Sequence, residues 1–199
     1  SVGEDGGSHQ SLEDISLMRV LPGMTVFCPC DAAETFKAVK AAAEIDGPVY
    51  IRLSRPGTDD VTGDSTPFVP GKAVVLRDGS DAAIFATGLM VTRALKAADI
   101  LAAEGISAAV VDVHTIKPLD EECILSYNGK VRAIVTAEEH FITGGLGSAV
   151  AEVIAGKGGA KFDRVGVEDK FGQSGAPSVL FEKYGLTAEN IAAKVRALL

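Results

Sequence analysis

The 199-residue sequence predicts an α/β fold with a mostly parallel sheet. Residues 24–28 and 49–53 are short apolar runs, and a helical pattern separates them. This order is the strand–helix–strand unit of a parallel sheet. Residues 108–113 are almost entirely apolar, which indicates a strand covered on both faces. Helical patterns also separate the later apolar runs, so the alternation continues along the chain.

The first part of the chain contains two predicted helices. One has its apolar positions from Leu12 onwards and ends at Pro22-Gly23. The other begins after Asp31, with Glu34 three residues further on, a spacing typical of a capping box. Its apolar residues Ala32, Phe36, Val39 and Ala43 share one face.

Residues 58–71 are rich in Thr, Asp, Pro and Gly and show no periodicity, so they are predicted to be an interdomain linker. A second α/β unit begins near Lys72. Asp78-Gly79 lies between two short apolar runs, 73–76 and 82–86, and predicts a β-hairpin. The remaining predicted strands are 131–136 and 163–167, and the remaining predicted helices follow Thr87-Gly88, Asp120 and Thr187 or span 147–154 and 178–184.

Composition narrows the function classes. A hydrophobic fraction of 47% is ample for a packed core, and no apolar run approaches the roughly 18 residues of a membrane helix. The net charge of −8 argues against a nucleic-acid partner. An odd number of cysteines, three, fits a reducing compartment, so we expect a cytoplasmic protein without membrane or signal segments.

The pair Cys28-Pro29-Cys30 lacks the two-residue spacer of a redox or zinc motif. We expect two partly buried small residues at a strand end there, and we predict no metal site in this chain.

The strongest candidate site lies in the glycine-rich loop at the start of the chain. Gly6-Gly7 lets the backbone turn so that Asp5 and His9 can face one pocket. Arg55 follows the strand 49–53, at the end of the strand where ligands bind in open α/β sheets. Its planar guanidinium matches a phosphate, although a surface ion pair explains its position equally well. An acid, a histidine and an arginine together suit a small hydroxylated, phosphorylated substrate.

Two further motifs have a structural explanation that we favour. The stretch 144–147, Gly-Gly-Leu-Gly, lies between a strand and a helix, as a phosphate cradle does. However, Val150 stands where a dinucleotide fingerprint needs Gly or Ala, so close helix packing or an interface turn is the preferred interpretation. His140 follows Glu138-Glu139, and His114 follows another strand, but neither is paired with an evident nucleophile. We expect both to be hydrogen-bonded structural or interface histidines.

Several motifs, in order, resemble the transketolase family. Residues 3–10 (Gly-Glu-Asp-Gly-Gly-Ser-His-Gln), 29–34 and 47–55 are similar to its pyrimidine-binding domain. Residues 115–120 and 138–147 are similar to its C-terminal domain. The match is closest to the C-terminal section or subunit of split transketolases. The 1-deoxy-D-xylulose-5-phosphate synthases share Asp-Gly-x-x-His and the later arginine, and remain an alternative. The β subunits of 2-oxoacid dehydrogenases match the opening loop less well.

The resemblance implies an enzyme of the pentose phosphate pathway that uses thiamine diphosphate and Mg²⁺. Such enzymes transfer a two-carbon ketol unit from a ketose phosphate to an aldose phosphate. By motif position, Asp5 and His9 match residues that contact the sugar near the cofactor, with His9 as the catalytic contact. Arg55 matches a residue that binds the substrate phosphate.

The resemblance also implies that the chemistry is shared with other segments. In the family, the cofactor-activating glutamate, the aromatic residue that stacks on the pyrimidine and the metal ligands lie outside the part matched here. We therefore expect the cofactor-binding residues upstream of Ser1 or on a partner chain, and none among residues 1–199. The isolated chain is expected to show no turnover and weak or no binding of thiamine diphosphate.

The expected partner is an N-terminal transketolase section, in a homodimer or heterotetramer. A non-catalytic dimerisation or regulatory module is a further alternative.

The expected division is a partial pyrimidine-binding domain at residues 1–57, the linker at 58–71 and the C-terminal domain at 72–199. In the family, the first strands of the pyrimidine-binding domain precede the part matched here. The segment 1–57 is therefore expected to be loosely packed and to be the first part that a protease cleaves.

Overall fold

A computed structural model of the chain describes residues 4–199. Its strands are β1 (Thr25–Phe27), β2 (Val49–Ile51), β3 (Val74–Arg77), β4 (Ala82–Ala86), β5 (Ala108–Asp112), β6 (Thr115–Lys117), β7 (Ala133–Phe141) and β8 (Lys161–Val167). Its helices are the 3₁₀ turn η1 (Gly7–His9), α1 (Asp14–Val20), α2 (Ala32–Glu44), α3 (Met90–Ala103), α4 (Glu121–Lys130), α5 (Leu146–Ile154), α6 (Pro177–Lys183) and α7 (Ala188–Leu198).

Two expectations involve residues outside this range. Ser1, upstream of which the cofactor-binding residues are expected, lies outside the described residues, and so does Gly3, the first residue of the motif 3–10. The location of the cofactor-binding residues therefore stays a prediction, whereas the motif can be followed from Glu4 onwards.

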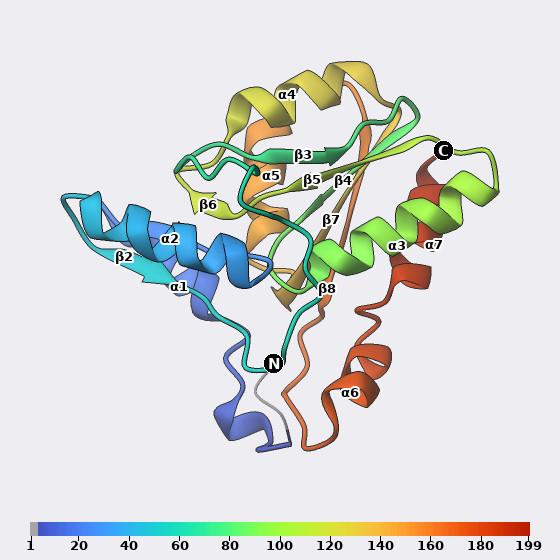
Figure 1. Cartoon of the computed structure of the whole chain (residues 1–199). Coiled ribbons are helices and arrows are strands. Elements are labelled where there is room, and N and C mark those ends of the chain that lie inside the picture. Colours follow the sequence, from blue (N-terminus) through green and yellow to red (C-terminus); the bar gives the residue numbers. More distant parts are fainter. Residues whose placement is uncertain (1–3) are drawn as a thin grey trace.

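The larger sheet has five strands in the order β3-β5-β4-β7-β8 (Figure 1). Strands β5, β4, β7 and β8 are parallel, and β3 runs antiparallel at one edge. The central strand β4 is buried at every residue, because helices cover both faces of the sheet. Ile84 packs in the cluster that contains α3 and α7, whereas Phe85 packs in the cluster that contains α4 and α5. The predicted α/β class with a mostly parallel sheet is confirmed.

The predicted hairpin at Asp78-Gly79 is wrong. Strand β5 lies between β3 and β4, so the two strands that this turn connects are not neighbours. Gly79 instead crosses the start of β5, where a Cβ atom on it would lie 2.1 Å from the backbone nitrogen of Ala109. The turn residues correctly indicate that the chain changes direction. They do not show which strands pair, because a strand from later in the sequence can lie between the two that the turn connects.

A smaller sheet contains strands from both sides of the expected linker. Its order is β2-β1-β6, with β1 parallel to β2 and antiparallel to β6. The sequence analysis missed β6, which pairs Phe27 with Thr115.

The expectation of loose packing is wrong for α1 and β1. Ile15 and Val26 are fully buried and belong to the same cluster as Phe85 and Ile134 of the larger sheet. Helix α2 is packed less tightly than α1 and β1. Its apolar residues Phe36 and Val39 are 62% and 51% exposed.

Residues 58–71 contain no helix or strand, yet they are held against the rest of the structure. Asp31 caps α2 by accepting a hydrogen bond from the backbone nitrogen of Glu34 at 2.8 Å. Its carboxylate also accepts from the backbone nitrogens of Val61 and Thr62. The capping box differs from the predicted one, because Glu34 accepts from the nitrogen of Cys30 rather than from that of Asp31.

Within the described part of the chain, no helix combines the length and apolar character needed to cross a bilayer.

Candidate functional site

The structure brings together two of the three candidate residues. The guanidinium of Arg55, which follows β2, donates a hydrogen bond to the carboxylate of Asp5 in the opening loop. Both side chains are accessible, at 68% for Arg55 and 40% for Asp5. An ion pair between side chains this exposed contributes little free energy, so a ligand can replace either partner at small cost in free energy.

His9 lies on the same loop, at the end of η1, and is exposed. Its Nδ1 atom is 3.1 Å from the hydroxyl of Ser8, which orients the ring. Asp5 and Arg55 are therefore in direct contact, and His9 is accessible on the same loop as Asp5.

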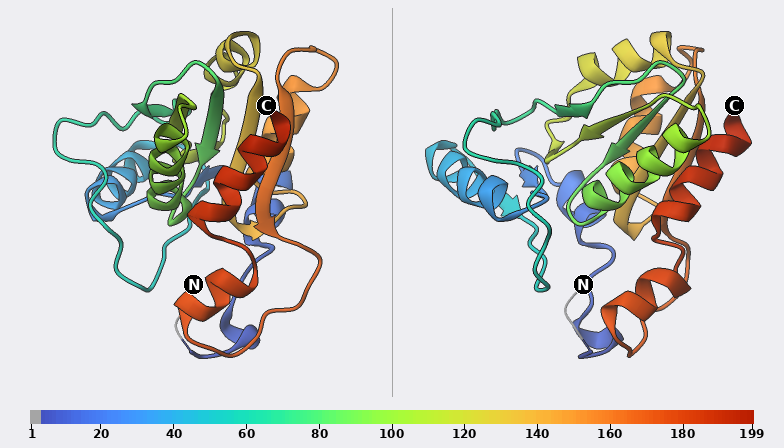
Figure 2. Two further views of the ribbon diagram at one scale, coloured as in Figure 1. Left: turned by 90° about the vertical axis from the view of Figure 1, so that its right-hand side faces the viewer. Right: turned by 45° about the vertical axis from the view of Figure 1, so that its right-hand side comes forward.

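A loop from the far end of the chain supports this region. The side-chain amide of Gln10 donates to the carbonyl of Gln173 at 3.1 Å. A Cβ atom on Gly7 would lie 2.7 Å from the carbonyl oxygen of Gly172, so the two backbones touch. Figure 2 shows the N-terminal turn beside the segment that leads into α6. The sequence analysis did not find this support, although a glycine-containing stretch between a strand and a helix was a usable sign.

Arg55 also borders a groove of about 670 Å³ between the start of α2 and residues 53–58. The wall formed by Phe36, Val39 and Leu53 is apolar, and these three residues are more than half exposed. The groove therefore combines a cationic rim with an apolar wall.

The glycine-rich stretch 144–147 holds a carboxylate of the chain itself. The backbone nitrogens of Leu146 and Gly147 donate to the carboxylate of Glu138 at 2.7 and 2.8 Å. A Cβ atom on Gly145 would lie 1.9 Å from Glu138 Oε2, so glycine is required there. Burial raises the pKa of Glu138 to about 7, against the two backbone donors, which lower it. Close packing at the start of α5, the preferred interpretation, is confirmed.

His140 is fully buried and contacts α1. The backbone nitrogen of Ser16 donates to its Nε2 atom at 3.3 Å, and its Nδ1 atom is 2.7 Å from the carbonyl of Phe141. Burial lowers its pKa, so the ring is neutral. These contacts confirm the expectation of a hydrogen-bonded structural histidine.

His114 is also buried. Its ring stacks on Phe68 of the segment 58–71, with ring centroids 4.1 Å apart, and its Nδ1 atom is 2.9 Å from the hydroxyl of Thr115. Burial lowers its pKa to about 4. The ring therefore serves as a neutral surface against which the predicted linker packs.

Arg52 is an important residue that the sequence analysis did not single out. Its side chain is 12% exposed, and its Nε atom donates to Asp14 at 2.9 Å. Glu139 lies 4.0 Å from its Nη1 atom, and the hydroxyl of Tyr50 donates to the same carboxylate of Asp14. The neighbouring charges raise its pKa despite burial, so Arg52 joins β2, α1 and β7 as a permanent cation.

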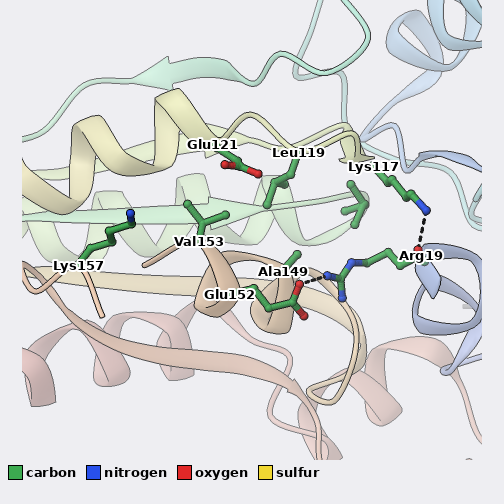
Figure 3. A pocket seen from close by; sticks show the side chains of 9 residues that line it. Arg19, Lys117, Leu119, Glu121, Ala149, Glu152, Val153 and Lys157 are labelled. Atoms are coloured by element: carbon green, nitrogen blue, oxygen red, sulfur yellow. Dashed lines mark hydrogen bonds and ion pairs between the residues drawn. The ribbon is translucent and has the colours of Figure 1, made fainter. Parts of the chain in front are cut away.

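Figure 3 shows a second pocket, of about 420 Å³, bounded by α1, β6, α4 and α5. Arg19 crosses it to pair with Glu152 at 2.7 Å. The ammonium of Lys117 donates to the backbone carbonyl of Arg19 at 2.8 Å. Arg19 and Lys117 therefore connect α1 to α5 and β6.

Two family models match different parts of the chain. Residues 71–191 match the model described as transketolase, C-terminal domain, and residues 1–59 match the transketolase pyrimidine binding domain. The chain belongs to the transketolase family.

Relatives of known sequence agree with this membership. The chain is 48% identical over 187 residues to a 6-deoxy-6-sulfo-D-fructose transketolase subunit of a Clostridium species, covering 94% of this chain and 58% of that protein. It is 46% identical to a putative transketolase C-terminal section of Methanocaldococcus jannaschii, covering 98% and 62%.

This transketolase-family chain is also 42% identical to the 1-deoxy-D-xylulose-5-phosphate synthase of Pelotomaculum thermopropionicum, covering 100% of this chain and 31% of that protein. Among solved structures, a split-gene transketolase, described as an inactive β4 tetramer, matches with a TM-score of 0.90 and 49% identity, over 97% of this chain and 62% of that one. Transketolase from Leishmania mexicana matches with a TM-score of 0.81 and 29% identity, over 98% and 28%. The chain thus spans about three fifths of the length of its split-type relatives.

Proposed function

We propose that the chain is the C-terminal section of a thiamine-diphosphate-dependent transketolase, and that it supplies the sugar-phosphate wall of a shared active site. The carrying observation is the contact between Arg55 and Asp5 on the loop that also bears His9. The enzyme would transfer a two-carbon ketol unit from a ketose phosphate to an aldose phosphate.

Each side chain suits one part of such a substrate. The guanidinium of Arg55 can donate two parallel hydrogen bonds to a phosphate, for which it would exchange the carboxylate of Asp5. Asp5 would then accept hydrogen bonds from sugar hydroxyls. His9, exposed and oriented by Ser8, would donate to the carbonyl or hydroxyl oxygen at the reacting end of the sugar.

Thiamine diphosphate, held by Mg²⁺, supplies the nucleophilic carbon when it is bound. Asp5, His9 and Arg55 offer a carboxylate, an imidazole and a guanidinium, a set that suits a sugar phosphate better than a metal-bound diphosphate. We propose that the cofactor is held mainly by an N-terminal section, in a homodimer or heterotetramer in the cytoplasm. The isolated chain is then inactive, and calorimetric titration of it with thiamine diphosphate should give no micromolar binding.

Two other substrate assignments have support. The 42% identity to a deoxyxylulose-phosphate synthase covers the whole chain and favours pyruvate with glyceraldehyde phosphate as substrates. The 48% identity to a sulfofructose transketolase subunit favours a ketose with a terminal sulfonate, which a guanidinium binds as it binds a phosphate. A non-catalytic dimerisation or regulatory module is the remaining alternative.

A coupled assay separates these assignments. The chain is combined with an N-terminal transketolase section, in trans or by fusion, and supplied with each substrate pair in the presence of the cofactor and Mg²⁺. Turnover of ketose phosphate with aldose phosphate is the expected result, and His9→Ala should abolish most of it. Turnover only with pyruvate would identify the synthase. If His9→Ala leaves the kinetics unchanged, the site assignment is wrong.

A further inference from the structure

Two buried carboxyl groups face each other where α2 meets the larger sheet. Glu34 lies in the first turn of α2 and is 2% exposed. Asp112 is the last residue of β5 and is fully buried. Ligand atoms of these two residues and of the buried Cys30 lie within 4.8 Å of one another.

Most of the carboxylate oxygens of this pair lack a hydrogen-bond donor. Both carboxylate oxygens of Asp112 and the Oε1 atom of Glu34 have no hydrogen-bond partner within the described structure. The other oxygen of Glu34 accepts from the backbone nitrogen of Cys30 at 2.7 Å. Two ionised carboxylates so close in a buried site would repel strongly, so the arrangement needs a proton or a cation between them.

The surroundings favour a proton. The neighbours of Asp112 in the sheet are Val74 and Ala86, which are apolar. The charged or titratable groups that act on the pair come from the start of α2, where Asp31 adds a negative charge and Cys30 contributes a thiol. Burial and nearby carboxylates raise the pKa of that thiol far above its usual range, so it keeps its proton and adds no negative charge to the pair. His114, the next titratable residue after Asp112 in the chain, is neutral.

We propose that Glu34 and Asp112 share one proton, and that this shared proton is a pH-sensitive latch between α2 and the larger sheet. With one proton, one carboxyl group donates to the other, and the contact is attractive. Without it, two negative charges face each other at the end of α2 that also borders the Arg55 groove. Raising the pH past the release of this proton therefore loosens α2. The latch does not depend on which substrate the active site accepts.

The sign of the effect follows from linkage. Burial and the mutual interaction raise the pKa of both carboxyl groups, so the folded state holds a proton that the unfolded state has released. The stability contribution is complete below the ordinary carboxyl range and is lost as the pH rises toward the pKa of the folded pair. Over that window the unfolding equilibrium constant increases by up to about tenfold for each pH unit.

Urea unfolding between pH 5.5 and 9 tests the latch in wild type, Asp112→Asn and Glu34→Gln. An amide can donate without a proton from solvent, so both variants should lose part of the pH slope. At pH 9 they should unfold at a higher urea concentration than wild type. Asp163→Asn, which changes an accessible carboxylate paired with Lys194, is the matched control and should keep the wild-type slope. Glu138 contributes a slope up to about pH 7 in every variant, so the range from pH 7 to 9 is decisive.

Infrared spectroscopy of the wild type keeps the proposal testable if the variants do not fold. At pH 8, where Glu138 is mostly ionised, a carbonyl band of a protonated carboxylic acid should remain. Absence of that band, or a pH slope of Asp112→Asn equal to that of wild type, would overturn the proposal. So would a stoichiometric metal ion in purified protein, because a cation would then replace the proton.

Discussion

At Gly145 a hydrogen atom in place of a side chain lets the carboxylate of Glu138 reach the first turn of α5. The sequence alone indicated tight packing in this stretch, because Val150 breaks the dinucleotide spacing. It did not indicate what the backbone nitrogens bind, since Glu138 comes from the preceding strand and meets them only in the folded chain. At the residue scale, motif spacing identified the special glycines but not their ligand.

Gly145→Ala should destabilise the protein by about 1–3 kcal/mol, because the new methyl group would overlap Glu138 and force it away from two donors. Gly129→Ala is the control, because its added Cβ atom meets nothing within 4 Å inside α4. It should be neutral or stabilising by up to about 1 kcal/mol. Urea denaturation of both variants measures the difference. Equal stabilities would mean that Glu138 does not occupy the start of α5.

Helices and strands with local signals were predictable. Asp31, Asp120 and Thr187 each cap the helix that they were expected to start. Strand β6 was not predictable, because its three residues gain their partner from β1, far earlier in the chain. The hairpin error has the same origin, since β5 inserts between strands that are adjacent in sequence. Pairing between distant elements depends on tertiary packing rather than on local propensity.

The contact of Arg52 with Asp14 and Glu139 joins three elements that the sequence does not place together. Arg52→Met should cost about 3–5 kcal/mol, because the mostly buried carboxylate of Asp14 would lose its cation. Arg77→Met removes an exposed pair with Asp99 and should cost about 1 kcal/mol or less. Thermal or urea denaturation compares the two. Similar losses of stability in the two variants would show that Arg52 stabilises the fold no more than a surface arginine does.

The whole molecule is two sheets joined into one structure, because β6 and the buried residues of α1 and β1 connect the early segment to the later unit. For this reason limited proteolysis should leave α1 and β1 intact and cut irregular segments outside them. Early cleavage inside α1 would contradict the shared core.

At the candidate site too, the sequence motifs indicate the residues, but not the contacts between segments that are far apart in the chain. Motif order is enough to propose Asp5, His9 and Arg55 as site residues, whereas the supporting contacts from Gly172 and Gln173 required the folded chain. The association of residues 5–10 with residues 172–174 explains how a glycine-rich loop keeps a defined shape at the end of the molecule.

The most direct test of the proposed function compares the KM values of two donors in the reconstituted enzyme. Arg55→Ala should raise the KM for a phosphorylated ketose by about 10- to 100-fold, the loss of a charge-assisted contact. The KM for an unphosphorylated ketose should stay within about twofold of wild type. Arg77→Ala, another accessible arginine in an ion pair, should change neither value. An equal change for both donors, or no change for either, would contradict the assignment of Arg55 as the phosphate-binding residue.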